Sequence, residues 1–236
     1  MEIISVLNYV NQPLSAPRVG ADGALSHIGE GVCFGTFGEL LQGALPPNGT
    51  DFLVTLPIER YSRAIFTQTY GQNGLTVEPA TKQKSLRLAA EIMARFGLPP
   101  SGHLQIQSSI PEGKGLASSS ADLVATARAL TLAYGIVLRC SDLEEMLRAI
   151  EPTDGVMYPG CVCFRHRDVH LHEHLGFLPE MEILAIDEGG IIDTVAFNRH
   201  DKRYLENELD EFDFLLNATK RAIREGDVAS IGRVAT

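Results

Sequence analysis

The pattern of apolar and polar residues predicts a strand, a turn and a helix in the middle of the chain. Residues 103–110 alternate so that their apolar side chains share one face, which is typical of a strand. From Leu123 to Leu130 the apolar positions recur at steps of four and three residues, which is the spacing of a helix. Residues 110–121 therefore lie where a strand ends and a helix begins.

Strands are also expected on both sides of this unit. The expected non-helical segments are a strand over 2–10, a loop over 13–23, strands in 31–70 around a turn at 46–49, a hairpin-type turn at 71–74, and two strands in 161–187 around Gly176 and Pro179.

Three further helices are predicted by helical spacing and by their end signals. The first covers 85–96, has Leu86 and Met93 on its apolar face, and is ended by Gly97 and Pro99. A capping-box pattern at 141–144 predicts a helix that stops at Pro152. The most regular pattern runs over 205–223. Because it lacks sustained heptads, it indicates packing on its own domain rather than a coiled coil.

Two glycines and three serines fill the turn between the central strand and helix. Gly113 and Gly115 allow the backbone to approach a phosphate and to adopt a positive φ. Ser118, Ser119 and Ser120 offer hydroxyls to a phosphate, to Mg²⁺, or as a cap of the helix. Since amides at a helix N-terminus attract anions, the segment predicts a nucleotide-phosphate loop. A serine-rich turn that only caps the helix is the alternative.

Two common phosphate-binding motifs do not fit this turn. A Walker loop requires Ser or Thr directly after its lysine, but Gly115 follows Lys114. A Rossmann fingerprint requires a third glycine where Ser118 stands. A phosphate loop at this position would belong to another class.

Three segments resemble the signature motifs of the GHMP kinase superfamily and follow one another in that family's order. Residues 110–122 resemble the second motif, with Ala117 in place of a glycine. Residues 35–43 look like the first motif, which ends in Gly-Glu-x-x-Gln-Gly, and residues 151–154 look like its Glu-Pro-Thr/Ser-Asp. The three segments are most similar to the L-threonine kinases of cobalamin and propanediol metabolism.

This resemblance implies an α+β fold of the GHMP kinase type. Residues 1–155 would form an N-terminal, ATP-binding lobe that is ribosomal S5 domain 2-like. Residues 156–236 would form an incomplete ferredoxin-like C-terminal lobe, because the family's third, glycine-rich motif is missing after Gly190.

The activity that the resemblance implies is ATP-dependent phosphorylation of a hydroxyl group, with L-threonine converted to O-phospho-L-threonine. A GHMP-type kinase for another small alcohol or amino acid is one alternative. A non-catalytic descendant that binds a nucleotide or metabolite is another.

The same resemblance assigns the nucleotide and metal contacts. The residues expected to bind ATP are Pro111, Gly113, Lys114, Gly115, Leu116, Ala117, Ser118, Ser119 and Ser120. Ser119 would also be a ligand of Mg²⁺, together with either Glu151 or Glu145. For Lys114, neutralisation of phosphate charge and plain exposure on a loop are both open.

Two further positions are expected to serve the substrate. Asp154 would accept or orient the proton of the substrate hydroxyl, and otherwise it would be a turn residue that supports Gly155. Gly38 and Glu39 would contact the substrate. Glu39 could pair with the ammonium group of threonine or serve as a structural carboxylate.

Composition narrows the class of protein. Hydrophobic residues make up 44% of the 236 residues and charged residues 21%, as in ordinary soluble proteins. A net charge of −10 and a pI near 5.1 argue against nucleic acid or an anionic membrane as partner. We find no apolar run near the roughly 20 residues of a membrane span and no basic start of a signal peptide. We therefore expect a cytoplasmic protein with a small-molecule substrate, and homodimerisation stays open.

Cysteine and histidine spacing favours structural roles. The four cysteines have no Cys-x-x-Cys spacing, which indicates reduced thiols in the core; they are Cys33, Cys140, Cys161 and Cys163. His170, His172 and His174 alternate on one strand face close to His166. A zinc site is the alternative to solvated histidines there.

Overall fold

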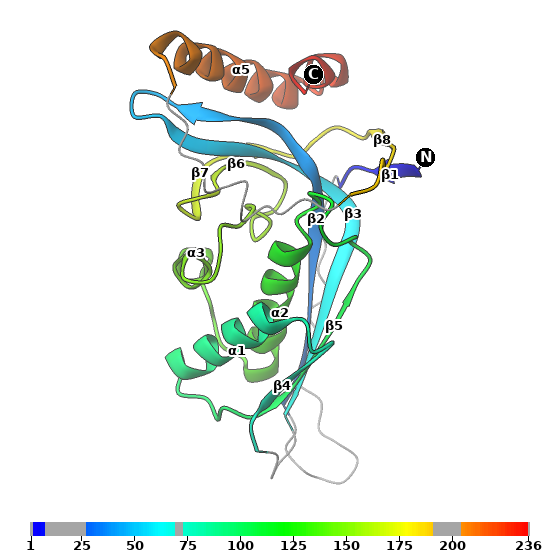
Figure 1. Cartoon of the computed structure of the whole chain (residues 1–236), viewed down its shortest axis with the longest axis vertical. Coiled ribbons are helices and arrows are strands. Elements are labelled where there is room, and N and C mark those ends of the chain that lie inside the picture. The colour runs from blue at the N-terminus through cyan, green and yellow to red at the C-terminus, as the bar shows by residue number, and fades with distance from the viewer. Residues whose placement is uncertain (1, 8–26, 69–72, 191–203, 236) are drawn as a thin grey trace.

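The computed structural model describes residues 2–7, 27–68, 73–190 and 204–235 (Figure 1). The strands of its main sheet are β2 (His27–Leu45), β3 (Thr50–Gln68), β4 (Leu75–Glu78), β5 (Gly102–Ser108), β6 (Cys161–Arg165) and β7 (His170–Gly176). Their order is β4-β5-β3-β6-β7, with β2 paired antiparallel to β3. A second, two-stranded sheet joins β1 (Glu2–Ser5) to β8 (Glu182–Ala185).

The helices lie in two groups (Figure 1). The first group is α1 (Gln83–Arg95), α2 (Ser118–Tyr134) and α3 (Cys140–Arg148), and it packs beside the long strands β2 and β3. The second group is α5 (Glu206–Glu225) and α6 (Val228–Val234), at the end of the molecule where β2 and β3 curve over. This mixture of helices and sheets confirms the predicted α+β class.

The long strand β3 contributes to two separate cores. Successive strand residues point to opposite faces. Leu53 therefore enters a core shared with α1, α2 and α3, while Phe52 and Val54 enter one closed by α5 and α6. These side chains are almost completely buried, so both helix groups are held on the same pair of strands.

Helix α2 packs directly against the backbone of β2. A Cβ atom at Gly29 or Gly31 would collide with α2 backbone atoms at Ala125, Ala129 and Ala133. Glycine on the strand and alanine on the helix thus permit this close approach. The contact fixes the N-terminus of α2, and with it the turn that precedes the helix.

Several sequence predictions are confirmed. The alternation in 103–110 forms β5, and the helical patterns in 85–96 and 205–223 form α1 and α5. Residues 46–49 connect β2 to β3, as the turn signal indicated. On the expected apolar face of α1, Met93 is fully buried but Leu86 is only partly buried, and the buried face also includes Leu88 and Ile92.

Two predictions of local structure are wrong. The described strands on either side of residues 71–74 do not pair as the expected hairpin, because β4 pairs parallel with β5 and not with β3. The expected capping box at 141–144 is also absent, since α3 begins at Cys140 without a side-chain cap. Its Glu144 is instead buried and accepts hydrogen bonds from the Tyr158 hydroxyl and the Leu171 amide. These tertiary hydrogen bonds, and not the local capping preference, determine the position of the Glu144 side chain.

The region 161–187 contains three strands where two were expected. A tight turn that includes Val169, with φ of 47°, divides the first stretch into β6 and β7. No glycine or proline signals this turn, so the sequence pattern missed it. At the N-terminus, β1 ends at Ser5, and the predicted loop 13–23 lies outside the described residues. The domain division at 155–156 stays a prediction, because β6 extends the sheet through β3.

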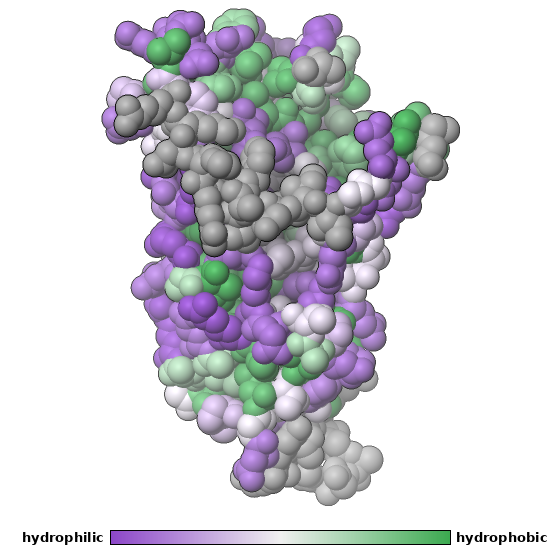
Figure 2. Space-filling view, viewed as in Figure 1, coloured by the Kyte–Doolittle hydropathy of each residue, from purple (hydrophilic) through white to green (hydrophobic). Residues whose placement is uncertain are grey.

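The remaining features are the cysteines, possible metal and membrane sites, and the apolar surface. Cys33, Cys161 and Cys163 are buried, Cys140 is partly buried, and none of the four forms a disulfide in this structure. The described residues contain no group of three or more His, Cys, Asp or Glu side chains arranged to hold a metal. None of the described helices is both long and apolar enough to cross a membrane. Figure 2 shows apolar residues gathered over the end that carries α5.

Candidate active site

The turn between β5 and α2 has the backbone conformation that the glycine pattern predicted. Gly113 and Gly115 have φ of 69° and 70°, where a side chain would be strained. The turn is tied to the irregular middle of β2, because the Gly38 amide donates to the Gly115 carbonyl at 3.0 Å and the Thr36 amide to the Leu116 carbonyl at 3.2 Å. The first and second family-like segments therefore lie side by side.

The N-terminus of α2 differs from the expectation in one detail. The cap residue is Ala117 in a left-handed conformation with φ of 57°, and no side chain caps the helix. None of the three serines is the cap. The first amides of a helix have no intrahelical partner and carry partial positive charge. The turn thus presents a helix N-terminus whose serines are free to serve other contacts.

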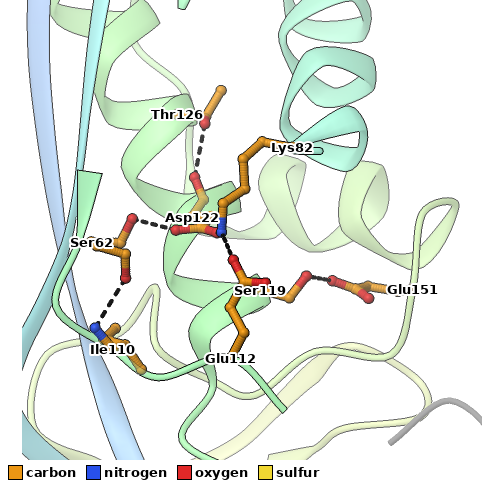
Figure 3. Close-up of polar contacts among 9 residues, drawn as sticks. Ser62, Lys82, Ile110, Glu112, Ser119, Asp122, Thr126 and Glu151 are labelled. Atoms are coloured by element: carbon orange, nitrogen blue, oxygen red, sulfur yellow. Dashed lines mark hydrogen bonds and ion pairs between the residues drawn. The ribbon is translucent and has the colours of Figure 1, made fainter. Parts of the chain in front are cut away.

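Ser119 and Glu151 come together from distant parts of the chain. The Ser119 hydroxyl donates to one oxygen of Glu151 (Figure 3), and the ammonium of Lys84 pairs with the other oxygen. The Glu151 side chain is 9% exposed, so the ion pair is partly shielded from water. This is a hydroxyl and a carboxylate at one point, with a lysine beside them.

Ser120 contacts Asp154 as Ser119 contacts Glu151. Its buried hydroxyl accepts from the Thr153 hydroxyl at 2.8 Å and from the Asp154 amide at 3.2 Å, and it donates to the Asp154 carboxylate at 3.2 Å. These contacts fix the orientation of Asp154 relative to the first turn of α2. The segment 151–154 is thereby held against the helix N-terminus.

Two carboxylates of the site, Asp154 and Glu39, have a raised pKa. Burial raises the pKa of Asp154 from its ordinary value of 3.8 to about 6. The hydrogen bond from Ser120 opposes this rise, and the charges of Glu39 and Glu151 add to it. Glu39 is exposed to the space in front of β2, yet the surrounding walls partly desolvate it and raise its pKa as well. Such shifts are typical of functional clefts.

A second network holds the other side of the turn. Lys82, at the start of α1, pairs with the Asp122 carboxylate at 2.6 Å and with Glu112 of the turn at 2.5 Å (Figure 3). Asp122 lies on α2, has a side chain that is 4% exposed, and also accepts from the Ser62 hydroxyl at 2.5 Å. The network therefore connects α1, α2, β3 and the turn.

Lys114 points to a different segment. Its ammonium lies 2.7 Å from the Asp187 carboxylate and 2.9 Å from the Gly190 carbonyl. The hydrogen bond from Lys114 lowers the pKa of Asp187. The residues after β8 thus reach the tip of the predicted phosphate loop.

These groups surround one cavity of about 1260 Å³. The predicted site residues that line it are Gly38, Glu39, Gly113, Lys114, Gly115, Leu116, Ala117, Ser118, Ser119, Ser120, Glu151 and Asp154. The far end of the cavity is bounded by residues of β8 and α6. A volume of this size is ample for a nucleotide together with a small substrate.

Two predicted residues lie elsewhere. Glu145 sits on α3, is 64% exposed, and pairs with Arg95 at 3.0 Å. It is absent from the cavity wall, so of the two glutamates considered as metal ligands the structure brings only Glu151 to Ser119. Pro111 is exposed before the turn and does not line the cavity.

Comparison with known proteins agrees with this geometry. Residues 83–162, which run from α1 through the turn and α2 to the start of β6, match the family model described as GHMP kinases N terminal domain. Over these residues the chain is similar to the N-terminal domain of GHMP kinases.

Relatives and solved structures with this domain resemble the chain over most of its length. An L-threonine kinase from Citrobacter freundii is 28% identical over 167 residues, which are 71% of this chain and 57% of that protein. The structure of L. major mevalonate kinase in complex with R-mevalonate superimposes with a TM-score of 0.53 at 17% identity, and covers 96% of this chain and 76% of that one. A structure of the mevalonate diphosphate decarboxylase from Enterococcus faecalis, reported for its mevalonate diphosphate mediated ATP binding mechanism, superimposes with a TM-score of 0.54 at 15% identity. The match covers 88% of this chain and 71% of that one.

These structural likenesses confirm a fold of the GHMP kinase type. The chain spans a little more than half the length of the curated relative that it matches. The site also contains residues that the sequence patterns did not single out, namely Lys82, Lys84 and Glu112. Lys82 and Lys84 stand at the start of α1, about 30 residues before the turn, and no local pattern links them to it.

Proposed function

We propose that the chain acts as an ATP-dependent phosphotransferase on the hydroxyl group of a small molecule, and that this molecule is L-threonine. One observation carries the proposal. The turn before α2, the Ser119–Glu151 pair and the partly buried Asp154 all face the same cavity. Phosphoryl transfer requires this set of parts, because its catalysis consists mainly of positioning and charge stabilisation.

The phosphates of ATP would lie against the turn. Gly113 and Gly115 leave the backbone without side chains there, and the N-terminus of α2 directs its amides and dipole to the same place. A peptide amide donates directly to phosphate oxygen, so the backbone of the turn would itself contribute to phosphate binding. The proposal assigns the β- and γ-phosphates to this position.

Ser119 and Glu151 would hold Mg²⁺. Both offer hard oxygen atoms, and they lie in hydrogen-bond contact, so one ion could be close to both. Such a pair suits Mg²⁺, which usually takes one or two carboxylates and keeps waters and phosphate oxygens as its other ligands. When bound, the ion would neutralise charge that develops on the phosphate oxygens.

Asp154 would serve the chemical step. As the substrate's hydroxyl oxygen bonds to the γ-phosphorus, its proton passes to the Asp154 carboxylate. The bond from that phosphorus to the bridging oxygen breaks, and its electron pair leaves with ADP. A pKa of about 6 keeps Asp154 ionised at neutral pH and makes it a stronger base than an ordinary aspartate.

L-threonine is proposed as the substrate on two grounds. The L-threonine kinase of Citrobacter freundii is a relative over 71% of the chain. In addition, Glu39 faces the cavity as a carboxylate with no lysine or arginine partner among the ion pairs of the described residues, and an ammonium group would complement it.

The direct test is phosphate transfer from labelled ATP to a series of acceptors. L-threonine should yield O-phospho-L-threonine. L-serine should react more slowly by roughly tenfold, since one methyl group in a pocket is worth about 1–3 kcal/mol. A simple alcohol should be rejected strongly, because the charged groups of the site would be left unpaired. Efficient transfer to a simple alcohol with threonine ignored would remove the proposed substrate. ATP binding without any transfer would instead indicate a non-catalytic binding protein.

A further inference from the structure

Lys82 has an environment that differs from that of the other lysines on the cavity wall. Three lysines line the cavity in the described part of the chain: Lys82, Lys84 and Lys114. The side chains of Lys84 and Lys114 are 49% and 27% exposed, whereas that of Lys82 is 13% exposed. Lys82 also contacts the turn from outside it, through its ion pair with Glu112.

The two acidic partners of Lys82 are held very differently. Asp122 is buried on α2 and fixed by the Ser62 hydroxyl, so it cannot leave its place without loss of both contacts. Glu112 has a side chain that is 68% exposed, and water can solvate it as soon as it turns away. One partner of Lys82 is therefore permanent and the other is exchangeable.

The charge balance of this cluster favours such an exchange. Burial acts to lower the pKa of Lys82, but the hydrogen bonds that it donates to Asp122 and Glu112 outweigh it, and the pKa is raised. The ammonium group is thus charged at any physiological pH and has three donors, of which Asp122 occupies one. Once Glu112 turns away, the remaining donors face the cavity in front of the turn.

We infer that Lys82 is a phosphate-binding residue of this site, which exchanges Glu112 for a phosphate oxygen of the nucleotide while Asp122 holds it in position. The inference rests on the proposed function in so far as the cavity must bind ATP. Protein kinases provide a physical parallel on another fold, since a lysine that contacts the phosphates is positioned there by a buried glutamate. In this chain Asp122 is the positioning residue and Glu112 occupies the anion site until phosphate arrives.

Two substitutions with opposite expected effects test the inference. Lys82→Met should weaken the binding of Mg-ATP by tenfold or more in calorimetry. Glu112→Gln removes the competing carboxylate and should strengthen Mg-ATP binding by about threefold or more. Adenosine, which has no phosphate, should bind both variants as it binds the unmodified protein. Lys220→Met serves as the matched control, since the Lys220 side chain is 18% exposed, pairs with Glu173 and does not line this cavity.

The inference can still be tested if the Lys82→Met variant does not fold. If Lys82→Met leaves Asp122 unpaired and unfolds the protein, the double variant Lys82→Met/Asp122→Asn removes both buried charges together, and the Glu112→Gln arm is unaffected. Equal Mg-ATP affinity in folded Lys82→Met and unmodified protein would overturn the inference about Lys82 but not the proposed function. So would a Glu112→Gln variant that loses affinity as Lys82→Met does, since that marks a purely structural network. Failure of the unmodified protein to bind Mg-ATP would overturn the proposed function itself.

Discussion

Replacement of Asp154 by asparagine should separate the chemical step from nucleotide binding. The substitution keeps the size of the side chain and removes the charge that would accept the hydroxyl proton. Turnover should fall by roughly 10²-fold or more, which is the usual contribution of a general base. The affinity for Mg-ATP should change little, because Asp154 contacts Ser120 and not the turn that faces the phosphates.

The same substitution has a calculable effect on stability. Burial raises the pKa of Asp154 from 3.8 to about 6, and each pKa unit corresponds to about 1.4 kcal/mol, so the shift represents roughly 3 kcal/mol. Because the folded-state pKa is raised, the stabilisation is fully present below pH 3.8 and is lost as pH rises through 6. The unmodified protein therefore loses stability over this range through Asp154, and the asparagine variant does not.

Denaturant unfolding of both proteins at pH 4 and pH 8 measures this effect. The free energy of unfolding of Asp154→Asn, relative to the unmodified protein, should increase by up to about 3 kcal/mol between the two values. In the unmodified protein kcat/KM should rise as pH passes about 6, since the base must be ionised. Near-normal turnover in the variant, or a stability difference that does not change with pH, would refute this account of Asp154.

The remaining predictions concern the metal and the helix cap. Glu151→Gln should raise the Mg²⁺ concentration required for half-maximal ADP formation by about tenfold. Glu145→Gln is the control and should leave this concentration unchanged. A larger effect of Glu145→Gln than of Glu151→Gln would instead indicate Glu145, on α3, as the metal ligand. Ala117→Gly should raise the free energy of unfolding by roughly 0.5–1 kcal/mol, because relief of the left-handed conformation exceeds the added chain entropy. A lower denaturation midpoint would mean that the packing of the Ala117 methyl group matters more.

Sequence patterns predicted the turn and its surroundings well because their determinants are local. The alternation before residue 110 and the helical spacing after residue 123 depend only on neighbouring side chains, and they form β5 and α2. Gly113 and Gly115 adopt the positive φ that their identity suggested. The three motif-like segments meet at one cavity, although their roles remain predictions.

Features set by distant parts of the chain were not predictable in this way. Strand β4 pairs with β5 across α1, so no turn near residues 71–74 could reveal its partner. Glu144 carries a capping pattern but is buried against Tyr158 and Leu171. The choice between the two candidate glutamates of the metal site depended on which face of α3 is turned outward.

The lysines of the site illustrate the same limit. Lys82 and Lys84 begin α1, and in the sequence they look like ordinary solvated residues at a helix start. Only the packing of α1 against α2 brings them to Asp122 and Glu151. A pairing that closes across 40 or more residues has no local pattern from which to predict it.

The most direct test of the central claim is the affinity for Mg-ATP of a variant in the turn. Gly115 has φ of 70°, and Gly115→Val would place a branched side chain where phosphate must approach. Gly97→Val is the matched control, since Gly97 has φ of 62°, open space around it, and no place on the cavity wall. Calorimetry should show Mg-ATP binding to the unmodified protein and to Gly97→Val, and at least tenfold weaker binding to folded Gly115→Val. Equal affinity in all three proteins would contradict the assignment of this turn as the phosphate loop.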